Sequence, residues 1–469
     1  MTGTAGSAAR RGALTGGAML GVVADVVAGV GAGLLCATVA MAAPTAAPAA
    51  SAPAAKAAAS VPATDAAAMQ ATTAALGDLG LALLRDAPGA NAVVSPLAVA
   101  TVLGMVQSGA TGTTEREIEA LFGAGRSGAA AMRRTLPALS AQLRGEGGAK
   151  AGAGESSSPP APPAAPAGAT APARQAARVW IDGTVAKDVP ASFKRRLAER
   201  HGADASVLSF ADTEGARAQI NRWTAEHTAG RVAELLPAGS IAKSTQVTLT
   251  AALHFRAAWA QPFDAEQTEA RPFAATAGGQ ATVPTLRDER SVAQAVVGGT
   301  QLYALPFAGG YDLVIALPAA ADGNVHALLQ GASGAIFARW QTALKTAAAP
   351  RCSFALPKFS FAPKAGSIKA PLERLGVKTA FTERAELRPM FGRGGTGAHV
   401  DDVLHAAGIA IDEQGGEAFA AAAATVKPKT LAAPPPPCAV DREFAFVVMH
   451  RASGAPLFVG RVGDPARSE

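Results

Sequence analysis

Helical patterns occupy the first half of this chain and strand patterns the second, and that order constrains the fold more than any other feature. Apolar residues between 69 and 83 recur at helical spacing, and Ser95–Pro96 is a typical start for a second helix. After Val247 strands dominate, and residues 302–317 and 444–462 each predict a hairpin. Because helices and strands do not alternate, the sequence predicts an α+β domain with large sheets rather than a doubly wound parallel sheet.

Residues 1–42 predict an export signal. Arg10 and Arg11 precede an apolar run over residues 13–40, and Ala40-Met41-Ala42 is a small-x-small cleavage pattern. We therefore expect a signal peptide and a secreted or periplasmic protein. The alternative, which the sequence leaves open, is that residues 13–40 remain as an uncleaved membrane anchor.

Two stretches of the chain lack large apolar side chains. Residues 43–65 are mostly Ala, Pro and Ser, and residues 145–173 are mostly Gly, Ala, Ser and Pro. Neither stretch can bury enough surface to offset the entropy of ordering, so we expect a disordered leader and a disordered insertion. The regular patterns resume after the insertion without a new start, which favours a single domain over residues 66–465.

The three cysteines in 469 residues exclude a disulfide framework and a zinc site built from Cys clusters. Export would place Cys352 and Cys438 in an oxidising compartment, where they could pair. The sequence gives no distance between them, so a disulfide and two free thiols both stay open at this point.

The charge pattern argues against a protein that binds polyanions. The chain carries 42 Lys+Arg against 36 Asp+Glu, and charged residues make up only 17% of it. We therefore expect no nucleic-acid partner. Lys194, Arg195 and Arg196 are interpreted as a solvated helix face, with a polyanion site as the alternative.

No arrangement of residues predicts catalysis, a metal or a cofactor. The seven His are scattered, with no pair at the helical spacing of a metal site. Residues 392–397 match Gly-x-Gly-x-x-Gly, but they precede a strand, and a nucleotide site would need a preceding strand and a following helix. A loop is the simpler interpretation. Motifs of nucleophile elbows, zinc proteases and P-loops are absent from the sequence, so we expect a protein that is not an enzyme.

Six motifs, in this order along the chain, resemble those of the serpin family from about residue 69 to residue 465, apart from the insertion. They lie at residues 91–97, 255–263, 356–359, 405–418, 444–446 and 456–462. The resemblance implies the serpin fold, with about eight to nine helices around three β-sheets and an exposed reactive-centre loop. It also implies a monomer that acts as a suicide substrate of a protease, with no catalytic residue, metal or small-molecule cofactor of its own.

The segment after residue 412 alternates in side-chain size. Every second residue from Gly416 to Ala424 is small, while the residues between them carry the bulk and the charge. Since alternate residues of a strand face opposite sides of a sheet, such a segment could enter a packed sheet with its small face inward. An Ala-rich linker is the alternative, but the position between a predicted strand and the C-terminal hairpin favours a hinge. Within a loop over residues 413–437, we predict this hinge at Glu413, Gln414, Gly415, Gly416, Glu417, Ala418, Phe419, Ala420, Ala421 and Ala422.

Insertion of this loop into a sheet would be strongly favourable. About a dozen residues would join two ladders, which at a net ~1 kcal/mol per backbone hydrogen bond gives on the order of 10–20 kcal/mol before entropy. A whole domain is typically stable by only ~5–15 kcal/mol. The intact protein is therefore expected to be a kinetic trap that cleavage of the loop releases.

Two basic residues indicate where the loop would be cut. Lys427 and Lys429 are the only ones in the stretch 418–440. Pro428 blocks the bond after Lys427, because Pro lacks an N–H and restricts the residue before it. The family's seventeen-residue spacing, counted from Glu413, also ends at Lys429. We expect Lys429–Thr430 as the scissile bond and a trypsin-like serine protease as the partner.

The resemblance further implies a sheet-opening region that contains Ser95, His405 and Trp259. In this chain Ala98 and Ala251 stand where the family has further polar residues, which would weaken that region. His405 could also be a satisfied core histidine, and Trp259 taken alone would be an ordinary core residue.

Other functions stay open beside inhibition of a trypsin-like protease. Gly416 stands where the family usually has Thr or Ser, and glycine lowers strand preference, so insertion could be slowed. The alternatives are a serpin-fold protein that does not inhibit, serving as a substrate, a carrier or a chaperone, and an inhibitor of papain-like cysteine proteases.

Overall fold

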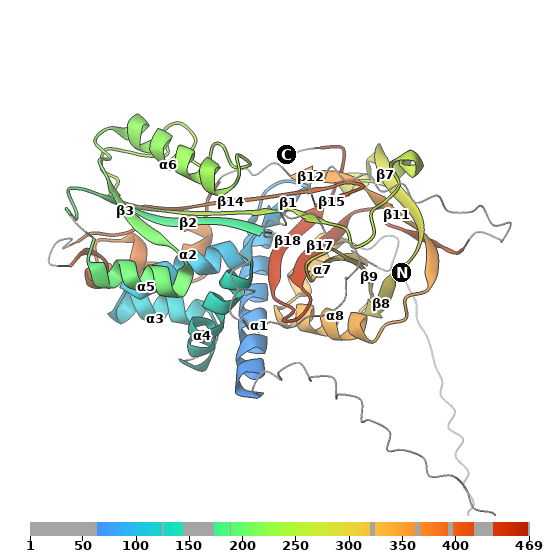
Figure 1. Ribbon diagram of the computed structural model, residues 1–469, viewed down its shortest axis with the longest axis horizontal. Coiled ribbons are helices and arrows are strands. Elements are labelled where there is room, and N and C mark those ends of the chain that lie inside the picture. Colours follow the sequence, from blue (N-terminus) through green and yellow to red (C-terminus); the bar gives the residue numbers. More distant parts are fainter. Residues whose placement is uncertain are drawn as a thin grey trace, which may run out of the picture. The chain divides into compact units, whose positions relative to one another are not determined.

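The computed structural model describes residues 63–123, 126–143, 173–187, 189–318, 324–361, 366–392, 397–416 and 435–467. Within these ranges the chain forms ten α-helices and three β-sheets (Figure 1), the α+β architecture that the sequence predicts. The helices outnumber the expected eight to nine because short ones such as α10 (Arg388–Phe391) are included. The predicted signal peptide, the insertion before residue 173 and all but the last three residues of the leader lie outside the described residues.

Helix α1 (Ala63–Asp86) begins three residues before the predicted end of the leader. Leucines of its apolar stripe are buried, and the helix packs against α4 (Arg126–Leu143) and α8 (Ala335–Lys345). The stretch Ala66–Asp86 is long and apolar enough to cross a membrane, but most of it is buried inside the domain, as in a core helix.

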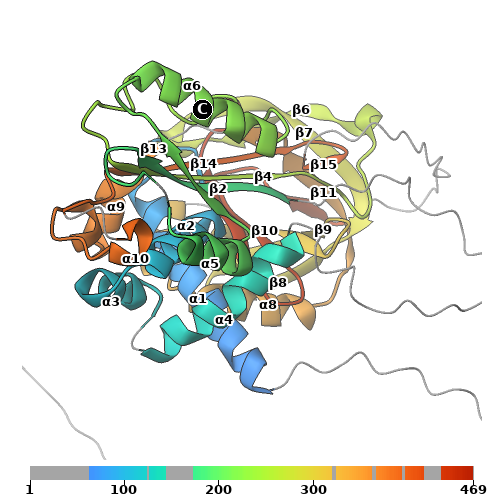
Figure 2. The ribbon, with the colours of Figure 1, turned by 60° about the vertical axis from the view of Figure 1, so that its left-hand side comes forward.

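Helix α2 (Pro96–Gly109) begins where the sequence predicts. Ser95 Oγ accepts a hydrogen bond from the backbone N–H of Ala98 at 3.2 Å, and Pro96 occupies the first turn. Nearly every residue of α2 is buried. In Figure 2, α2 and α5 lie on one side of the largest sheet and α6 on the other. The remaining helices are α3 (Gly112–Leu121), α5 (Ala191–His201), α6 (Thr213–His227), α7 (Val325–Gly331) and α9 (Lys369–Arg374).

The largest sheet has eight strands, and two long buried strands lie at its centre. Strands β4 (Val247–Phe255) and β14 (Asp402–Ile411) run parallel and form seven residue pairs, from Asp402 with Thr248 to Gly408 with His254. All nine residues of β4 are buried. The other strands are β3 (Asp204–Leu208), β2 (Ala173–Asp182), β5 (Ala257–Ala258), β12 (Phe359–Phe361), β13 (Gly366–Ser367) and β15 (Gly415–Gly416).

The two faces of this sheet pack against different clusters. Odd-numbered residues of β4 and β14 join the main core, which includes α1 and α2. Even-numbered residues such as Ala252, Leu404 and Ala406 pack with Trp180 and with Ile220 of α6. A strand added between β4 and β14 would therefore have one side in the main core and the other under α6.

The other two sheets contain the predicted hairpins. A six-stranded sheet has the order β1 (Ala92–Val94), β18 (Pro456–Val462), β17 (Phe444–His450), β10 (Tyr311–Pro318), β9 (Thr300–Pro306) and β8 (Ala293–Val297). Both hairpin predictions, β9–β10 and β17–β18, are confirmed. A four-stranded sheet has the order β16 (Pro437–Ala439), β11 (Arg351–Pro357), β7 (Gln280–Ser291) and β6 (Glu269–Ala274).

A disulfide joins two neighbouring strands of the four-stranded sheet. Cys352 on β11 is bonded to Cys438 on β16, with 5.9 Å between the two Cα atoms. Strands β11 and β16 run parallel and pair directly. Of the two states that the sequence left open, the structure thus shows the disulfide.

Candidate functional site

The predicted hinge begins inside the largest sheet. After β14 the chain turns at Asp412, whose carboxylate accepts hydrogen bonds from the backbone N–H groups of Gln414 and Gly415 at 2.8 and 3.1 Å. Gly415 and Gly416 then form β15, which lies between β14 and β5 and is antiparallel to both. The first two residues of a new strand are therefore already in place at one end of the β4–β14 pair.

Both positions in β15 have a local reason to be glycine. Gly415 has φ +143°, and a Cβ there would overlap the carbonyl oxygen of Ala257. A Cβ on Gly416 would lie 3.1 Å from a ring carbon of Phe255, a tight contact with a fully buried side chain. Phe255 would have to shift by a few tenths of an ångström to admit the Thr or Ser that the family usually has at this position.

Glu413 holds the hinge to the body of the domain. Its carboxylate accepts hydrogen bonds from Lys358 Nζ at 2.9 and 3.0 Å and from Thr268 Oγ1 at 2.8 Å. Burial raises the pKa of Glu413, but the hydrogen bonds from Lys358 and Thr268 outweigh burial and hold this pKa below its ordinary value. The residue is therefore an anion at neutral pH.

Trp259 contacts the backbone of the hinge at two points. Its indole Nε1 donates to the carbonyl oxygen of Asp412 at 2.8 Å, and its backbone N–H donates to the carbonyl oxygen of Gln414 at 2.9 Å. The indole ring stacks on Phe307, with 4.2 Å between centroids and 5° between planes. Trp259 is therefore more than core: it binds the turn that leads into β15.

In the predicted sheet-opening region, one imidazole is hydrogen-bonded to two backbone groups. His405 Nδ1 donates to the carbonyl oxygen of Ala251 at 2.9 Å, and His405 Nε2 accepts from the backbone N–H of Ser95 at 3.1 Å. Burial lowers the pKa of His405 to about 4, although its hydrogen bond to Ala251 opposes that shift. His405 is therefore neutral at pH 7, and its two hydrogen bonds place the proton on Nδ1.

Ser95 and His405 are in contact, but the hydrogen bond between them does not use the Ser95 side chain. The Ser95 hydroxyl caps α2, and the Ser95 backbone N–H contacts His405. At Ala251, where a polar side chain was expected, the main-chain carbonyl serves as the acceptor. The predicted sheet-opening region thus contains hydrogen bonds despite the alanines at 98 and 251.

Sequence reasoning missed Lys358 and Thr268 as partners of the hinge. Lys358 lies inside the motif at residues 356–359, which was the only signal for it, and Thr268 gave none. The remaining predicted site residues, at positions 417–422 and at Lys429–Thr430, lie outside the described residues.

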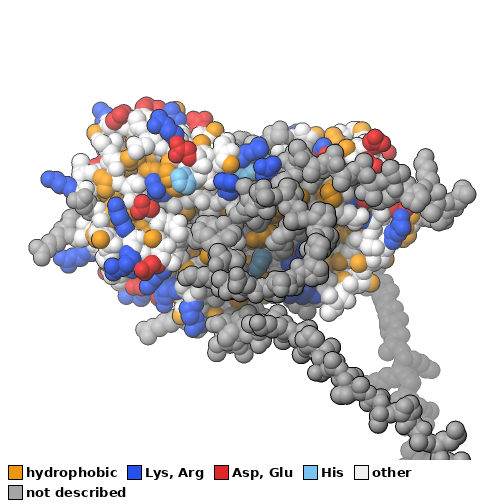
Figure 3. Space-filling view, viewed as in Figure 1, with side chains coloured by type: hydrophobic (Ala, Val, Ile, Leu, Met, Phe, Trp, Pro, Cys, Tyr) orange, Lys and Arg blue, Asp and Glu red, His pale blue; other side chains and the backbone are white. Residues whose placement is uncertain are grey.

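The basic residues that predict a solvated helix face lie on α5 and not on the hinge. Lys194 and Arg195 on α5 are exposed, whereas Arg196 Nε donates to the carbonyl oxygen of Ser108 at 3.0 Å. On the face shown in Figure 3, the described Lys and Arg side chains are interspersed with Asp and Glu.

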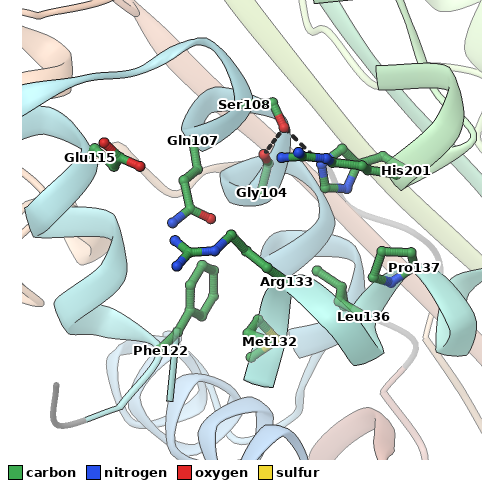
Figure 4. A pocket seen from close by; sticks show the side chains of 11 residues that line it. Gly104, Gln107, Ser108, Glu115, Phe122, Met132, Arg133, Leu136, Pro137 and His201 are labelled. Atoms are coloured by element: carbon green, nitrogen blue, oxygen red, sulfur yellow. Dashed lines mark hydrogen bonds between the residues drawn. The ribbon is translucent and has the colours of Figure 1, made fainter. Parts of the chain in front are cut away.

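Two hollows border the helices rather than the hinge. The one in Figure 4 lies among α2, α3, α4 and α5 and measures about 50 Å³, room for a few water molecules. In it Ser108 bonds the imidazole of His201, and Arg133 projects between the helices. The other measures about 370 Å³ and is lined by residues of β2, β3, α5 and α6, among them Arg178 and Trp223.

Comparison with known proteins identifies the family. The sequence profile described as Serpin (serine protease inhibitor) matches residues 74–465. A putative serpin-Z8 of Oryza sativa subsp. japonica is 30% identical over 415 residues, covering 81% of this chain and 92% of the relative. Serpin B6 of Bos taurus is 28% identical over 404 residues, covering 85% and 100%. The chain therefore belongs to the serpin family.

Solved structures show the same fold. The chain is similar to Manduca sexta serpin-12, with a TM-score of 0.68 and 22% identity over 85% of this chain and 99% of the other. It is also similar to native protease nexin-1 with heparin, with a TM-score of 0.69 and 22% identity over 86% and 99%. At these identities the likeness establishes the serpin fold alone.

Proposed function

We propose that this protein inhibits trypsin-like serine endopeptidases as a suicide substrate that is cleaved at Lys429–Thr430. The observation that carries the proposal is the position of Gly416, which already pairs with β14 on one side and β5 on the other. The family supports protease inhibition in general. The trypsin-like preference rests on Lys429, the basic residue with an unblocked bond after it.

The strand registers favour insertion of the loop between β4 and β14. Gly416 pairs with one residue of β5 and one of β14; counting six residues back along both neighbours leads to Ala251 and His405, which pair with each other. A strand continuing from Gly416 would place Ala422 between Ala251 and His405. Both new ladders would then form without any shift of the flanking strands.

The same register would turn the small residues toward the main core. Residues directly opposite in neighbouring strands point to the same face of a sheet. Even-numbered loop residues would thus face the main core with the odd-numbered residues of β4 and β14. Phe419 would fall on the α6 face, opposite Gly408, which has no side chain.

The chemistry belongs to the target protease. Its catalytic serine would attack the carbonyl carbon of Lys429, forming an ester, while the bond to the nitrogen of Thr430 breaks and that nitrogen takes the proton. The freed segment would then insert before water attacks the ester and would carry the acyl-enzyme with it. Opening the β4–β14 pair breaks the His405–Ala251 hydrogen bond, which insertion replaces with two new ladders.

One experiment tests the proposal. The chain without residues 1–42 is mixed with trypsin and run on a denaturing gel, where inhibition gives a stable band at the summed mass. Lys429→Ala should lose this band, while Lys427→Ala serves as the matched control and should keep it. Clean cleavage without a complex would refute inhibition, and a complex with papain but not with trypsin would reassign the target class.

The carrier alternative has one observation in its favour. The hollow of about 370 Å³ has the size of a small-ligand site. The indole N–H of Trp223 and the side-chain amide of Gln175, which line this hollow, have no hydrogen-bond partner among the described residues. Carriage alone would leave the melting temperature unchanged after cleavage, which separates it from inhibition.

We also propose that the protein is secreted or periplasmic. The predicted signal peptide supports export, and the disulfide between Cys352 and Cys438 suits an oxidising compartment. Fractionation of the native host, with the N-terminus of the exported chain sequenced, tests both the location and the cleavage after Ala42.

A further inference from the structure

We propose that the Cys352–Cys438 disulfide is a clamp that keeps the uncut loop out of the largest sheet, so that cleavage becomes the only route to insertion. The proposal rests on the proposed function, since it concerns the same loop. The disulfide in the four-stranded sheet would thus preserve the form of the protein that can inhibit.

The loop is tethered at both ends, and the two ends lie in different sheets. It leaves the largest sheet at Gly416 and joins the four-stranded sheet at β16, with 20 residues, 417–436, between them. In the register set by Gly416, residue 425 would reach the far end of the β4–β14 pair, opposite Asp402 and Thr248. Nine residues would thus lie in the sheet and eleven would remain for the return.

Those eleven residues would have to run from the far end of the largest sheet back to β16, and they are almost too short for that path. The inserted stretch would span roughly 30 Å at about 3.4 Å per residue, and eleven residues reach at most about 36–40 Å when fully extended. The return must also pass around the sheet, which lengthens the path, and it contains prolines at 434–436. Full insertion of an uncut loop would therefore stretch the return almost to its full length, and this tension would pull β16 away from β11.

Without the disulfide, β16 would be held by one short ladder and by the burial of residue 438 at its centre. It is an edge strand with three residue pairs, all to β11. Pro436 and Pro437 have no N–H to donate, and the flanking bonds are Ser353 N–H to the carbonyl of Pro436 and Val440 N–H to the carbonyl of Ala355, both at 2.9 Å. Insertion would form two ladders of about ten residues each, whereas the release of β16 would break one ladder of three residues.

The disulfide changes this balance, because peeling β16 away would now require breaking a covalent bond. Cys352 is fully buried and Cys438 is 5% exposed, so a reductant reaches the bond only when the sheet opens locally. Cys438 also follows the proposed scissile bond by nine residues. Cleavage at Lys429–Thr430 frees the inserting segment from β16, so the clamp does not hinder the inhibitory route.

The test compares the intact chain with a Cys352→Ala/Cys438→Ala double variant. Both are incubated uncut below their melting temperature, and samples are assayed over time for melting temperature, native-gel mobility and trypsin complex. We expect the variant to convert several-fold faster than the wild type to a form that melts as high as the cleaved protein and forms no complex. If the disulfide merely stabilised the fold, the double variant would melt at a lower temperature than the wild type and would yield no such high-melting form.

Two controls keep this result interpretable. The variant cleaved by trypsin should melt as high as the cleaved wild type, which shows that it folds and can insert. In a second arm, wild-type protein is reduced with dithiothreitol, whose two thiols become its cyclic disulfide while Cys352 and Cys438 become thiols; alkylation then keeps these thiols from pairing again. The reduced wild type should convert as the variant does.

The outcomes separate the two proposals. If cleavage raises the melting temperature of both proteins but the uncut variant and the reduced wild type persist as long as the oxidised wild type, the clamp is refuted and the inhibitor proposal stands. If cleavage raises neither melting temperature, loop insertion itself fails, and both proposals fall together.

Discussion

His405 Nδ1 donates a hydrogen bond to the carbonyl oxygen of Ala251 across the one pair of strands that must separate if a new strand is to enter the sheet. The same imidazole accepts the backbone N–H of Ser95 at the start of α2. One neutral side chain thus ties β4, β14 and α2 together at the middle of the proposed insertion path. Loss or protonation of the His405 imidazole should therefore weaken the contact between β4 and β14 directly.

Removal of the imidazole should destabilise the intact protein. His405→Ala removes the acceptor of the buried Ser95 N–H and a hydrogen bond to the Ala251 carbonyl, so we expect a loss of about 2–4 kcal/mol. Ser95→Ala is the matched control, because it removes only the hydroxyl cap of α2 and should cost about 1 kcal/mol. Urea denaturation of the uncut chains measures both, and equal losses would contradict the role given to His405.

The stability of the intact protein should fall between pH 6.5 and pH 4 because of His405. Its pKa is lowered by burial to about 4, so the unfolded chain binds this proton at higher pH than the native one. The stabilisation is therefore complete above about pH 6.5 and is lost as the pH falls toward 4, by up to about 3 kcal/mol. Urea midpoints at pH 7 and pH 4.5 should differ more for the wild type than for His405→Gln. If the midpoint changes equally with pH in both proteins, the assignment to His405 is wrong.

The features that the sequence predicts correctly are those with local signals. Ser95–Pro96 marks the start of α2 because capping and proline chemistry act within one turn, and the β17–β18 hairpin follows from strand runs around a short turn. The His405–Ala251 bond had no such signal, since every residue carries a backbone carbonyl and only the fold selects this one. The disulfide was also undecided, because Cys352 and Cys438 lie 86 residues apart and meet only through the pairing of β11 with β16.

The ion pair at the hinge should contribute measurably to stability. Glu413→Gln removes the charge that Lys358 and Thr268 face, and we expect a loss of about 1.5–3 kcal/mol, the range for a hydrogen bond to a charged group. Thr268→Val removes one hydrogen bond donated by a neutral hydroxyl and should cost less. Because the pKa of Glu413 is lowered in the native state, the difference between wild type and Glu413→Gln should be full at pH 7 and shrink below about pH 4.5. A difference that persists unchanged at pH 3 would exclude this ionic role.

The two hinge glycines should respond differently to a single methyl group. At Gly415 an alanine would have to adopt φ +143° and overlap the carbonyl of Ala257, so we expect a cost of about 1–3 kcal/mol and release of β15 from the sheet. At Gly416 the tightest contact of the added methyl is with the ring of Phe255 at 3.1 Å, so a smaller effect is expected. Trp259 reports on the release of β15, because its indole N–H donates a hydrogen bond to the carbonyl of Asp412 just before the hinge. Tryptophan emission of Gly415→Ala should shift to the red and be quenched more by acrylamide than that of Gly416→Ala. The same substitutions in a Trp259→Phe background should lose the difference, and if they keep it, the signal comes from another tryptophan and β15 is not released.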